Sequence, residues 1–122
     1  MTTPAVRADD DATQALCALM EEIDACTARL EQARERAEQL LQRRRAGSSW
    51  EAIVTGEERP LIVEQISSVL AALNGAGADW RREQAAALQA EDVSINRIAA
   101  MFGVTRQRIS ALLKDSGADQ AG

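Results

Sequence analysis

Basic and polar side chains that could hydrogen-bond to an anionic polymer lie close together in residues 95–114, INRIAAMFGVTRQRISALLK. Arginine and lysine pair with phosphate, and arginine and glutamine can each make two hydrogen bonds to the edge of a base. The residues of this kind are Arg97, Arg106, Gln107, Arg108, Ser110 and Lys114. Between residues 94 and 114 there are four basic residues and no acidic one, which suits contact with a polyanion.

The charge of this segment is opposite to that of the rest of the chain. The 122 residues carry a net charge of −5, so without the four positive charges of the segment the remainder carries −9. A local basic surface on an acidic protein is the electrostatic pattern expected where a chain binds nucleic acid. The charge distribution therefore favours a nucleic-acid surface confined to these residues.

The spacing of small and apolar residues predicts two short helices joined by a tight turn. The inner face of the first would be Ile95, Ile98 and Ala99, and that of the second Ile109, Leu112 and Leu113. Gly103 stands at the turn, where closely crossing helices are expected to leave no room for a Cβ. Val104 is expected to fill the turn from inside. Ser94 and Thr105 are the expected N-caps of the two helices.

Residues 95–114 resemble the helix-turn-helix of bacterial transcription regulators. The stretch IAAMFGVTRQRISALLK is most similar to the homeodomain-like type found in resolvase DNA-binding domains and in the last region of sigma factors. The resemblance covers 20 residues, or 36 if residues 79–91 form a supporting first helix, in which Ala85 and Leu88 would point inward. It implies a tri-helical domain over residues 79–114, with residues 105–114 in the major groove. The whole chain also resembles small actinobacterial regulators with a coiled coil before such a motif.

The resemblance assigns a position in the major groove to outward residues of the second helix. These are Arg106, Gln107, Ser110 and Lys114. The base-reading set is expected to be Arg106, Gln107, Ser110 and Ala111, because arginine prefers guanine, glutamine prefers adenine and alanine leaves space for a thymine methyl. The expected phosphate contacts are Arg81, Arg82, Arg97, Thr105, Arg108 and Lys114.

A long helix is expected over residues 10–46, because this stretch is rich in helix formers and contains no Gly or Pro. Apolar residues follow a heptad repeat, with Leu16, Ile23, Leu30 and Ala37 at one core position and Leu19, Cys26, Ala33 and Leu40 at the other. A helix with one apolar stripe needs a partner. The partner could be a second copy or the later helices of the same chain. We favour a homodimer through these residues, with the helix direction left open.

Local signals predict the remaining elements. Gly47 would end the long helix, and Ser48 would cap a short one in a capping box with Glu51. Pro60 would open the next helix as a first-turn residue. The NGAGA stretch over residues 74–78 is expected to stop that helix and to form a flexible link, after which Asp79 would cap another.

These signals together predict an all-α chain with a coiled coil, short middle helices and a C-terminal helix-turn-helix. The expected segments are a disordered start (1–9), a coiled-coil dimerisation helix (10–46), middle helices with a linker (47–78), a DNA-binding domain (79–114) and a flexible tail (115–122).

Composition argues against several other classes of protein. The chain has no His, so a Ser–His–Asp triad is excluded, and two thiols are too few for a tetrahedral zinc site. Cys17 and Cys26 fall in one predicted helix and cannot pair with each other, although a Cys26–Cys26 bridge between two copies remains an alternative to free thiols. We expect no cofactor and no enzymatic activity. Without a signal sequence or a long apolar run, the chain is expected in the cytoplasm, at the nucleoid.

Two functional hypotheses follow. The first is a sequence-specific regulator of transcription that binds double-stranded DNA as a homodimer. The second is a protein-interaction module, in which the acidic coil would engage a sigma factor, the polymerase or another regulator. A nucleoid-associated protein of low sequence specificity would combine the two. The basic segment favours the first hypothesis.

Overall fold

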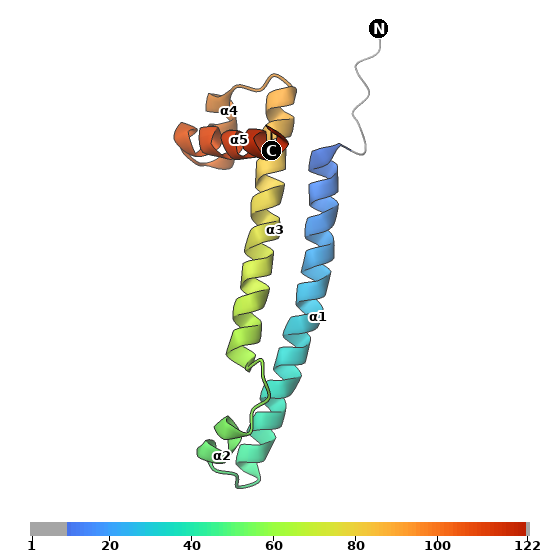
Figure 1. Cartoon of the computed structure of the whole chain (residues 1–122), viewed down its shortest axis with the longest axis vertical. Helices are drawn as coiled ribbons and strands as arrows, with labels where there is room; N and C mark the ends of the chain where they lie inside the picture. The colour runs from blue at the N-terminus through green and yellow to red at the C-terminus, as the bar shows by residue number, and fades with distance from the viewer. Residues whose placement is uncertain (1–9, 122) are drawn as a thin grey trace. The chain divides into compact units, whose positions relative to one another are not determined.

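The computed structural model of the protein describes residues 10–121, with side chains for residues 10–114 (Figure 1). Within this range the chain consists of helices and their connections. The five helices are α1 (Asp11–Arg45), α2 (Trp50–Thr55), α3 (Ile62–Ala90), α4 (Ile95–Phe102) and α5 (Arg106–Ala121). The expected all-α class and long first helix are confirmed. The expected disorder of residues 1–9 lies outside the described residues.

The described residues form two compact units. Residues 20–75 make up the first, here called the hairpin unit, with most of α1, all of α2 and the first half of α3. Residues 10–19 and 76–121 belong to the second, here called the α4–α5 unit. The buried apolar side chains are Cys26, Ala33, Ile53 and Val69 in the hairpin unit, and Ala85, Ile98, Ala99 and Ile109 in the α4–α5 unit.

Caps at both ends explain the extent of α1. The Asp10 carboxylate accepts a hydrogen bond from the Thr13 N–H at 2.8 Å. At the other end Gly47 has a φ of 107°, and its N–H donates to the carbonyl of Arg44 at 3.1 Å. The N–H of Ser48 donates to an earlier carbonyl of the last turn, which completes a Schellman motif. Gly47 therefore ends the helix, as the sequence predicts.

The short helix α2 is capped by Ser49, one residue later than expected. The Ser49 hydroxyl accepts a hydrogen bond from the Ala52 N–H at 3.1 Å. Ser48 cannot take this role because it belongs to the turn that closes α1. The predicted capping box of Ser48 with Glu51 is therefore wrong.

Two carboxylates cap the start of α3. Glu64 accepts a hydrogen bond from the N–H of Leu61, and Glu57 accepts one from the N–H of Ile62, both at 2.9 Å. These contacts place Leu61 at the N-cap, so the helix begins at Ile62. Pro60, which was expected within the first turn, lies just before the helix.

α3 continues without a break through residues 74–78. The predicted stop at Asn74, the flexible link and the new cap at Asp79 are therefore wrong. Asp79 lies inside the helix, where its carboxylate pairs with Arg82. A glycine inside a helix costs about 1 kcal/mol relative to alanine. Ending one helix and nucleating another would forfeit several backbone hydrogen bonds, which outweighs that cost.

The last helix is also longer than predicted. The expected helix stops at Lys114, whereas the backbone of α5 remains helical to Ala121. No proline interrupts this stretch, so each added residue can still donate a backbone hydrogen bond to the preceding turn. The predicted end of the helix at Lys114 is therefore wrong, since residues 115–121 continue it.

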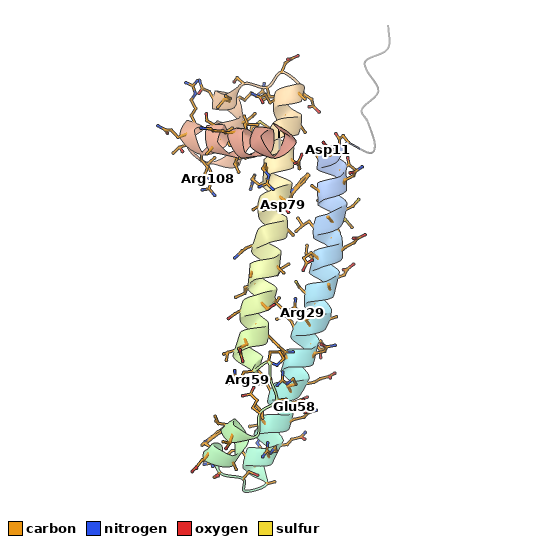
Figure 2. All side chains as sticks on the ribbon, viewed as in Figure 1. Asp11, Arg29, Glu58, Arg59, Asp79 and Arg108 are labelled. Carbon is orange, nitrogen blue, oxygen red and sulfur yellow. The ribbon has the colours of Figure 1, made fainter. Side chains whose placement is uncertain are left out.

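Within the hairpin unit, α1 and α3 lie side by side and run antiparallel (Figure 1). The Cys26 thiol lies 3.9 Å from the carbonyl oxygen of Val69, and both side chains are 1% exposed. Arg29, labelled in Figure 2, donates a hydrogen bond to the Ser68 hydroxyl at 2.8 Å. Of the two partners that the heptad pattern allows, a later helix of the same chain thus covers one side of α1.

This packing divides the residues assigned to the dimer interface. One heptad position is buried or half-buried, namely Leu19, Cys26, Ala33 and Leu40, and the other is exposed, namely Leu16, Ile23, Leu30 and Ala37. Cys26 and Ala33 are only 1% and 5% exposed, so their assignment to a contact with a second copy is wrong. The burial of Cys26 also excludes the alternative of a Cys26–Cys26 bridge.

Candidate nucleic-acid interface

The α4–α5 unit holds the basic segment on a core drawn from three helices. Ala85 of α3, Ile98 of α4 and Ile109 of α5 are each 0% exposed, and Ala99 joins them. Partly buried apolar side chains surround this core, namely Leu88, Val93, Ile95, Phe102, Leu112 and Leu113. The inward positions predicted for both short helices are confirmed.

Two hydroxyl groups begin the short helices. The Ser94 hydroxyl accepts a hydrogen bond from the Arg97 N–H at 3.2 Å, and the Thr105 hydroxyl accepts one from the Arg108 N–H at 3.1 Å. Both predicted N-caps are therefore confirmed. Each cap leaves a basic side chain in the first turn of its helix, where backbone N–H groups also favour an anion.

The turn between the helices depends on the backbone conformation of Gly103. Its φ of 69° and ψ of 33° lie in the left-handed region, and its N–H donates to the carbonyl of Ala100 at 3.3 Å. A Cβ at this position would meet nothing within 4 Å, so the expected lack of space is wrong. Glycine is needed here for conformation. Val104 is 41% exposed and does not fill the turn from inside.

Opposite the buried Ile109, α5 presents a polar face. At about 100° per residue, the side chains farthest from Ile109 are Gln107, Ala111 and Lys114, with Ser110 beside them. Arg106 and Arg108 lie on opposite flanks of this face, and Figure 2 shows Arg108 on the outer surface of α5. All six side chains are exposed. The structure thus brings the base-reading candidates and two phosphate candidates onto one accessible helix surface.

The positive charge of this surface is not neutralised within the described part of the chain. The salt bridges among the described residues involve Arg34, Arg36, Arg59 and Arg82. Arg97, on α4, and the basic residues of α5 therefore have no described carboxylate at salt-bridge distance. A phosphate group could pair with them without displacing any of the described carboxylates.

Arg81 and Arg82, which were expected to contact phosphate from a supporting helix, have different surroundings. Both lie well inside α3, so their expected place near a helix start is wrong. The guanidinium of Arg81 lies over the Phe102 ring at 4.2 Å from its centre and stays exposed. Arg82 is paired with Asp79, and 22% of its side chain is exposed. Arg82 is therefore a poorer candidate for a phosphate contact than Arg81.

Sequence reasoning missed the contact between Arg81 and Phe102. It is a cation–π contact between residues far apart in the chain, and no local pattern predicts it. It also missed Asn96, whose exposed side chain lies in the first turn of α4 beside Arg97. The available signal was its position directly after the Ser94 cap region, where a polar side chain can reach a phosphate.

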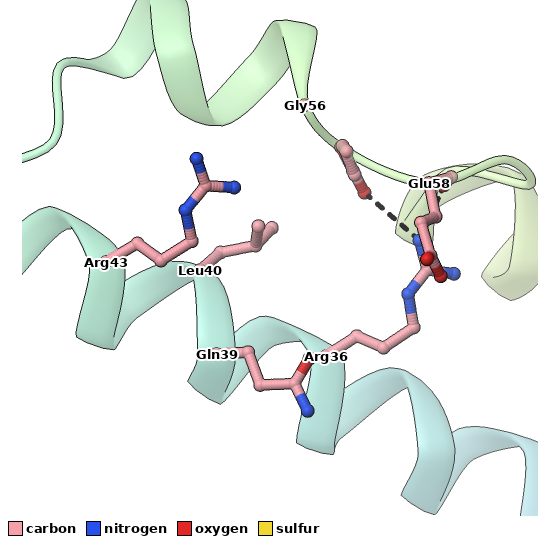
Figure 3. A pocket seen from close by; sticks show the side chains of 7 residues that line it. Arg36, Gln39, Leu40, Arg43, Gly56 and Glu58 are labelled. Carbon is pink, nitrogen blue, oxygen red and sulfur yellow. Dashed lines mark hydrogen bonds and ion pairs between the residues drawn. The ribbon is translucent and has the colours of Figure 1, made fainter.

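A cavity of about 250 Å³ opens in the hairpin unit (Figure 3). Its lining is mostly polar and consists of Arg36, Gln39, Leu40, Arg43, Gly56, Glu57 and Glu58. Arg36 donates a hydrogen bond to the Glu58 carbonyl at 2.6 Å and lies 4.0 Å from the Glu57 carboxylate. Arg36 therefore ties the segment between α2 and α3 to α1.

The two cysteines sit in contrasting surroundings. Cys17 is exposed and Cys26 is buried. Burial raises the pKa of the Cys26 thiol, and the hydrogen bond to Glu22 and the negative charge of Glu22 raise it further, whereas Arg29 acts in the opposite direction. Cys26 therefore stays protonated and packs as a small apolar side chain.

Comparison with protein-family models, with curated proteins and with solved structures found no match for the chain. Among the residues that the structure describes, no group of three or more potential metal ligands lies together. None of the described helices is long and apolar enough to cross a membrane.

Proposed function

We propose that the protein is a sequence-specific regulator of transcription that binds double-stranded DNA as a homodimer at the nucleoid. In this proposal α4 and α5 form a helix-turn-helix, and α5 is the recognition helix in the major groove. The observation that carries the proposal is the row of exposed hydrogen-bonding side chains on α5, whose positive charges have no described carboxylate partner. The resemblance of residues 95–114 to bacterial helix-turn-helix motifs adds support.

The contacts divide by position on α5. Gln107 and Ser110 lie on the outward face in the first turns, where a recognition helix approaches the base edges most closely. Arg106 precedes them on one flank and can reach a guanine, and Ala111 offers a methyl-sized surface to thymine. Arg108 and Lys114, with Arg97 of α4, would pair with phosphates and fix the position of the helix.

A dimer would present two copies of α5 to the DNA. Two-fold symmetric helix-turn-helix proteins bind half-sites about 34 Å apart, which is one turn of the duplex. The proposal therefore expects a site composed of two related half-sequences.

Selection from a pool of random duplexes tests this function directly. Wild-type protein is expected to enrich one sequence motif with two-fold symmetry, and Gln107→Ala is expected to lose the preference at one base pair of each half-site. Arg34→Ala serves as a matched control, because this exposed arginine on α1 pairs with Glu38 and lies outside the proposed interface.

The outcome separates the three hypotheses. Enrichment of DNA without a shared motif would replace the proposal with a nucleoid-associated protein of low specificity. Failure of wild-type protein to bind any duplex at low salt would favour the protein-interaction module instead. An equal loss of preference in the Arg34→Ala control would remove α5 as the reader of sequence.

A further inference from the structure

Large apolar side chains remain exposed along both long helices of the hairpin unit. They are Met20, Ile23, Leu30 and Leu41 on α1, and Val63, Ile66 and Leu70 on α3, with exposed fractions between 38% and 67%. Scattered apolar residues on a surface are normal, whereas a continuous apolar patch indicates a site of contact. The side chains on α1 form one apolar row and those on α3 another. The two rows form one continuous surface if they lie on the same side of the hairpin unit.

The position of each row follows from the contact between the helices. On α1, Cys26 points toward α3, and Arg29 lies about 60° to one side of it at about 100° per residue. Ile23 and Leu30 lie about 40–60° to the other side, as does Leu41. Arg29 and the apolar row therefore occupy opposite flanks of α1.

The apolar row of α3 also lies on one flank of its helix. Val69 points toward α1, Ser68 lies about 100° to one side, and Ile66 and Leu70 lie about 60–100° to the other. Because Arg29 donates a hydrogen bond to Ser68 at 2.8 Å, these two residues mark the same side of the unit. The apolar rows of α1 and α3 must then share the opposite side. We name this surface the shared apolar face.

We propose that the shared apolar face binds the same face of a second copy of the chain, with the two α1 helices antiparallel. This inference rests on the homodimer of the proposed function and assigns it a surface and a direction. A two-fold symmetric contact requires a surface that complements itself, and an apolar face meets this requirement. The charged side chains beside its row on α1, Arg34 and Glu38, pair with each other.

The size of the face is compatible with a second copy. From Met20 to Leu41, α1 rises about 32 Å at about 1.5 Å per residue. Because α3 begins at Ile62 and Cys26 lies beside Val69, α3 accompanies only about the first 20 Å of this stretch. Two helices about 9 Å apart give a width of about 18 Å there, and α1 alone gives about 9 Å beyond it, so the footprint is about 470 Å². This is more than half of the roughly 800 Å² that each partner buries in a typical stable interface.

Charge along α1 favours the antiparallel direction. The acidic residues Glu21, Glu22 and Asp24 lie at the level where the face starts but on other sides of α1, and Arg43, Arg44 and Arg45 follow its end. None of these six forms a salt bridge with another described residue. With residue 23 of one copy near residue 37 of the other, antiparallel α1 helices bring the acidic residues of one copy to about 8 Å along the axis from Arg43 of the other, whereas parallel helices would align like charges.

Sedimentation in the absence of DNA tests the proposed contact. Wild-type chain at micromolar concentration should sediment with about twice its mass of 13.2 kDa. Leu70→Glu should sediment at the monomer mass with its helical circular dichroism retained, because Leu70 is 56% exposed within one chain. Ala28→Glu is the matched control, since it adds the same charge on the outer side of α1, and it should remain dimeric.

Three results would overturn the contact. A monomeric wild type would leave the face to a partner other than a second copy, and a dimeric Leu70→Glu would place the interface elsewhere. Dissociation of the Ala28→Glu control would show that charge on any side of α1 disrupts the dimer. None of these measurements involves DNA, so failure of DNA binding would count against the proposed function alone.

Cysteine cross-linking tests the direction. With the centre of the face near Leu30, antiparallel helices place residue 23 of one copy near residue 37 of the other. In a Cys17→Ser background, chains with Ile23→Cys and chains with Ala37→Cys should form disulfides mainly with each other when mixed. Preferential pairing of Ile23→Cys with itself would overturn the antiparallel arrangement.

Discussion

At the scale of single residues, Gly103 separates two reasons for which a turn requires glycine. Its surroundings are open, since a Cβ would meet nothing within 4 Å, but its φ of 69° is one that L-residues adopt at a cost of about 1–2 kcal/mol. Asparagine tolerates this conformation better than alanine, and β-branched residues tolerate it least. Backbone conformation and side-chain size therefore predict different orders of stability for substitutions at this position.

A substitution series at Gly103 should follow backbone conformation. Gly103→Asn should lose the least stability, Gly103→Ala about 1–2 kcal/mol, and Gly103→Val the most. Urea denaturation followed by circular dichroism measures the three differences. If the order followed side-chain volume instead, with asparagine worse than alanine, a close contact at the turn would have to be present.

The side chains of α5 should divide into base readers and phosphate anchors. Arg106→Ala should relax the preference at one base pair and cost about 1–3 kcal/mol on the specific duplex. Lys114→Ala should weaken binding to specific and scrambled duplexes alike, and should lower the salt slope by about one ion. Binding of each variant to both duplexes across a salt series makes the comparison. Equal losses on the two duplexes for Arg106→Ala would exclude it as a base reader.

The two thiols should react at very different rates. Cys17 is exposed and should be modified quickly by a thiol reagent, whereas Cys26 should react only when the hairpin unit opens. The pKa of Cys26 is raised above its usual 9.0, so folding favours the protonated thiol. This contribution to stability is present below pH 9 and is lost as the pH rises through the raised pKa. Labelling of a Cys17→Ser variant should therefore accelerate above about pH 9; rapid labelling at neutral pH would contradict the burial of Cys26.

At the scale of elements, the sequence predicted best those features that depend on neighbouring residues. The caps at Ser94 and Thr105 and the turn at Gly103 each depend on hydrogen bonds to residues within one turn, and all three are found where expected. The continuity of α3 depends instead on a balance between the cost of glycine and the cost of starting a new helix. The residue types at positions 74–78 predicted the end of a helix, whereas α3 continues through them.

In the candidate site, too, the sequence predicted the features that depend on neighbouring residues and missed those that depend on distant ones. The exposed positions on α5 follow from helical periodicity once Ile109 is known to be buried. The stacking of Arg81 on Phe102 and the pairing of Arg82 with Asp79 follow from the path of α3, which the sequence signals did not predict. The assignment of Cys26 and Ala33 to a dimer failed for a related reason. A heptad repeat shows that a helix needs a partner but does not say which one.

Alanine at the two glycines of α3 should report whether this helix is continuous. A Cβ at Gly75 or Gly77 would meet nothing within 4 Å, and both lie in helical backbone. Gly75→Ala and Gly77→Ala should each stabilise the protein by about 0.5–1 kcal/mol. The midpoint of urea denaturation measures the gain. A loss of stability in either variant would indicate a turn at residues 74–78 in place of the continuous helix.

At the scale of the whole molecule, each unit has a thin core for the length of its helices. The hairpin unit buries four apolar residues, two of them the small Cys26 and Ala33, while its two long helices leave large apolar side chains in contact with water. Burial of those side chains against a second copy would add stabilisation at about 25 cal/mol per Å² of apolar surface. Stability and DNA binding should therefore both depend on protein concentration.

Disrupting the dimer should weaken DNA binding without altering α5. Ile23→Glu and Leu30→Glu place a charge on side chains that are 46% and 42% exposed in one chain, so each monomer should keep its helical content. A monomer binds only one half-site at a time. Its affinity for a duplex with two half-sites should therefore fall by about 10²–10⁴-fold, with little change in affinity for a duplex with a single half-site. Titrations of both duplexes, with Ala28→Glu as the control, measure the ratio. Equal weakening on the two duplexes would mean that the substitutions damage the DNA-binding unit. Unchanged affinity for the two-half-site duplex in a variant shown to be monomeric would mean that the protein binds its site as a single copy.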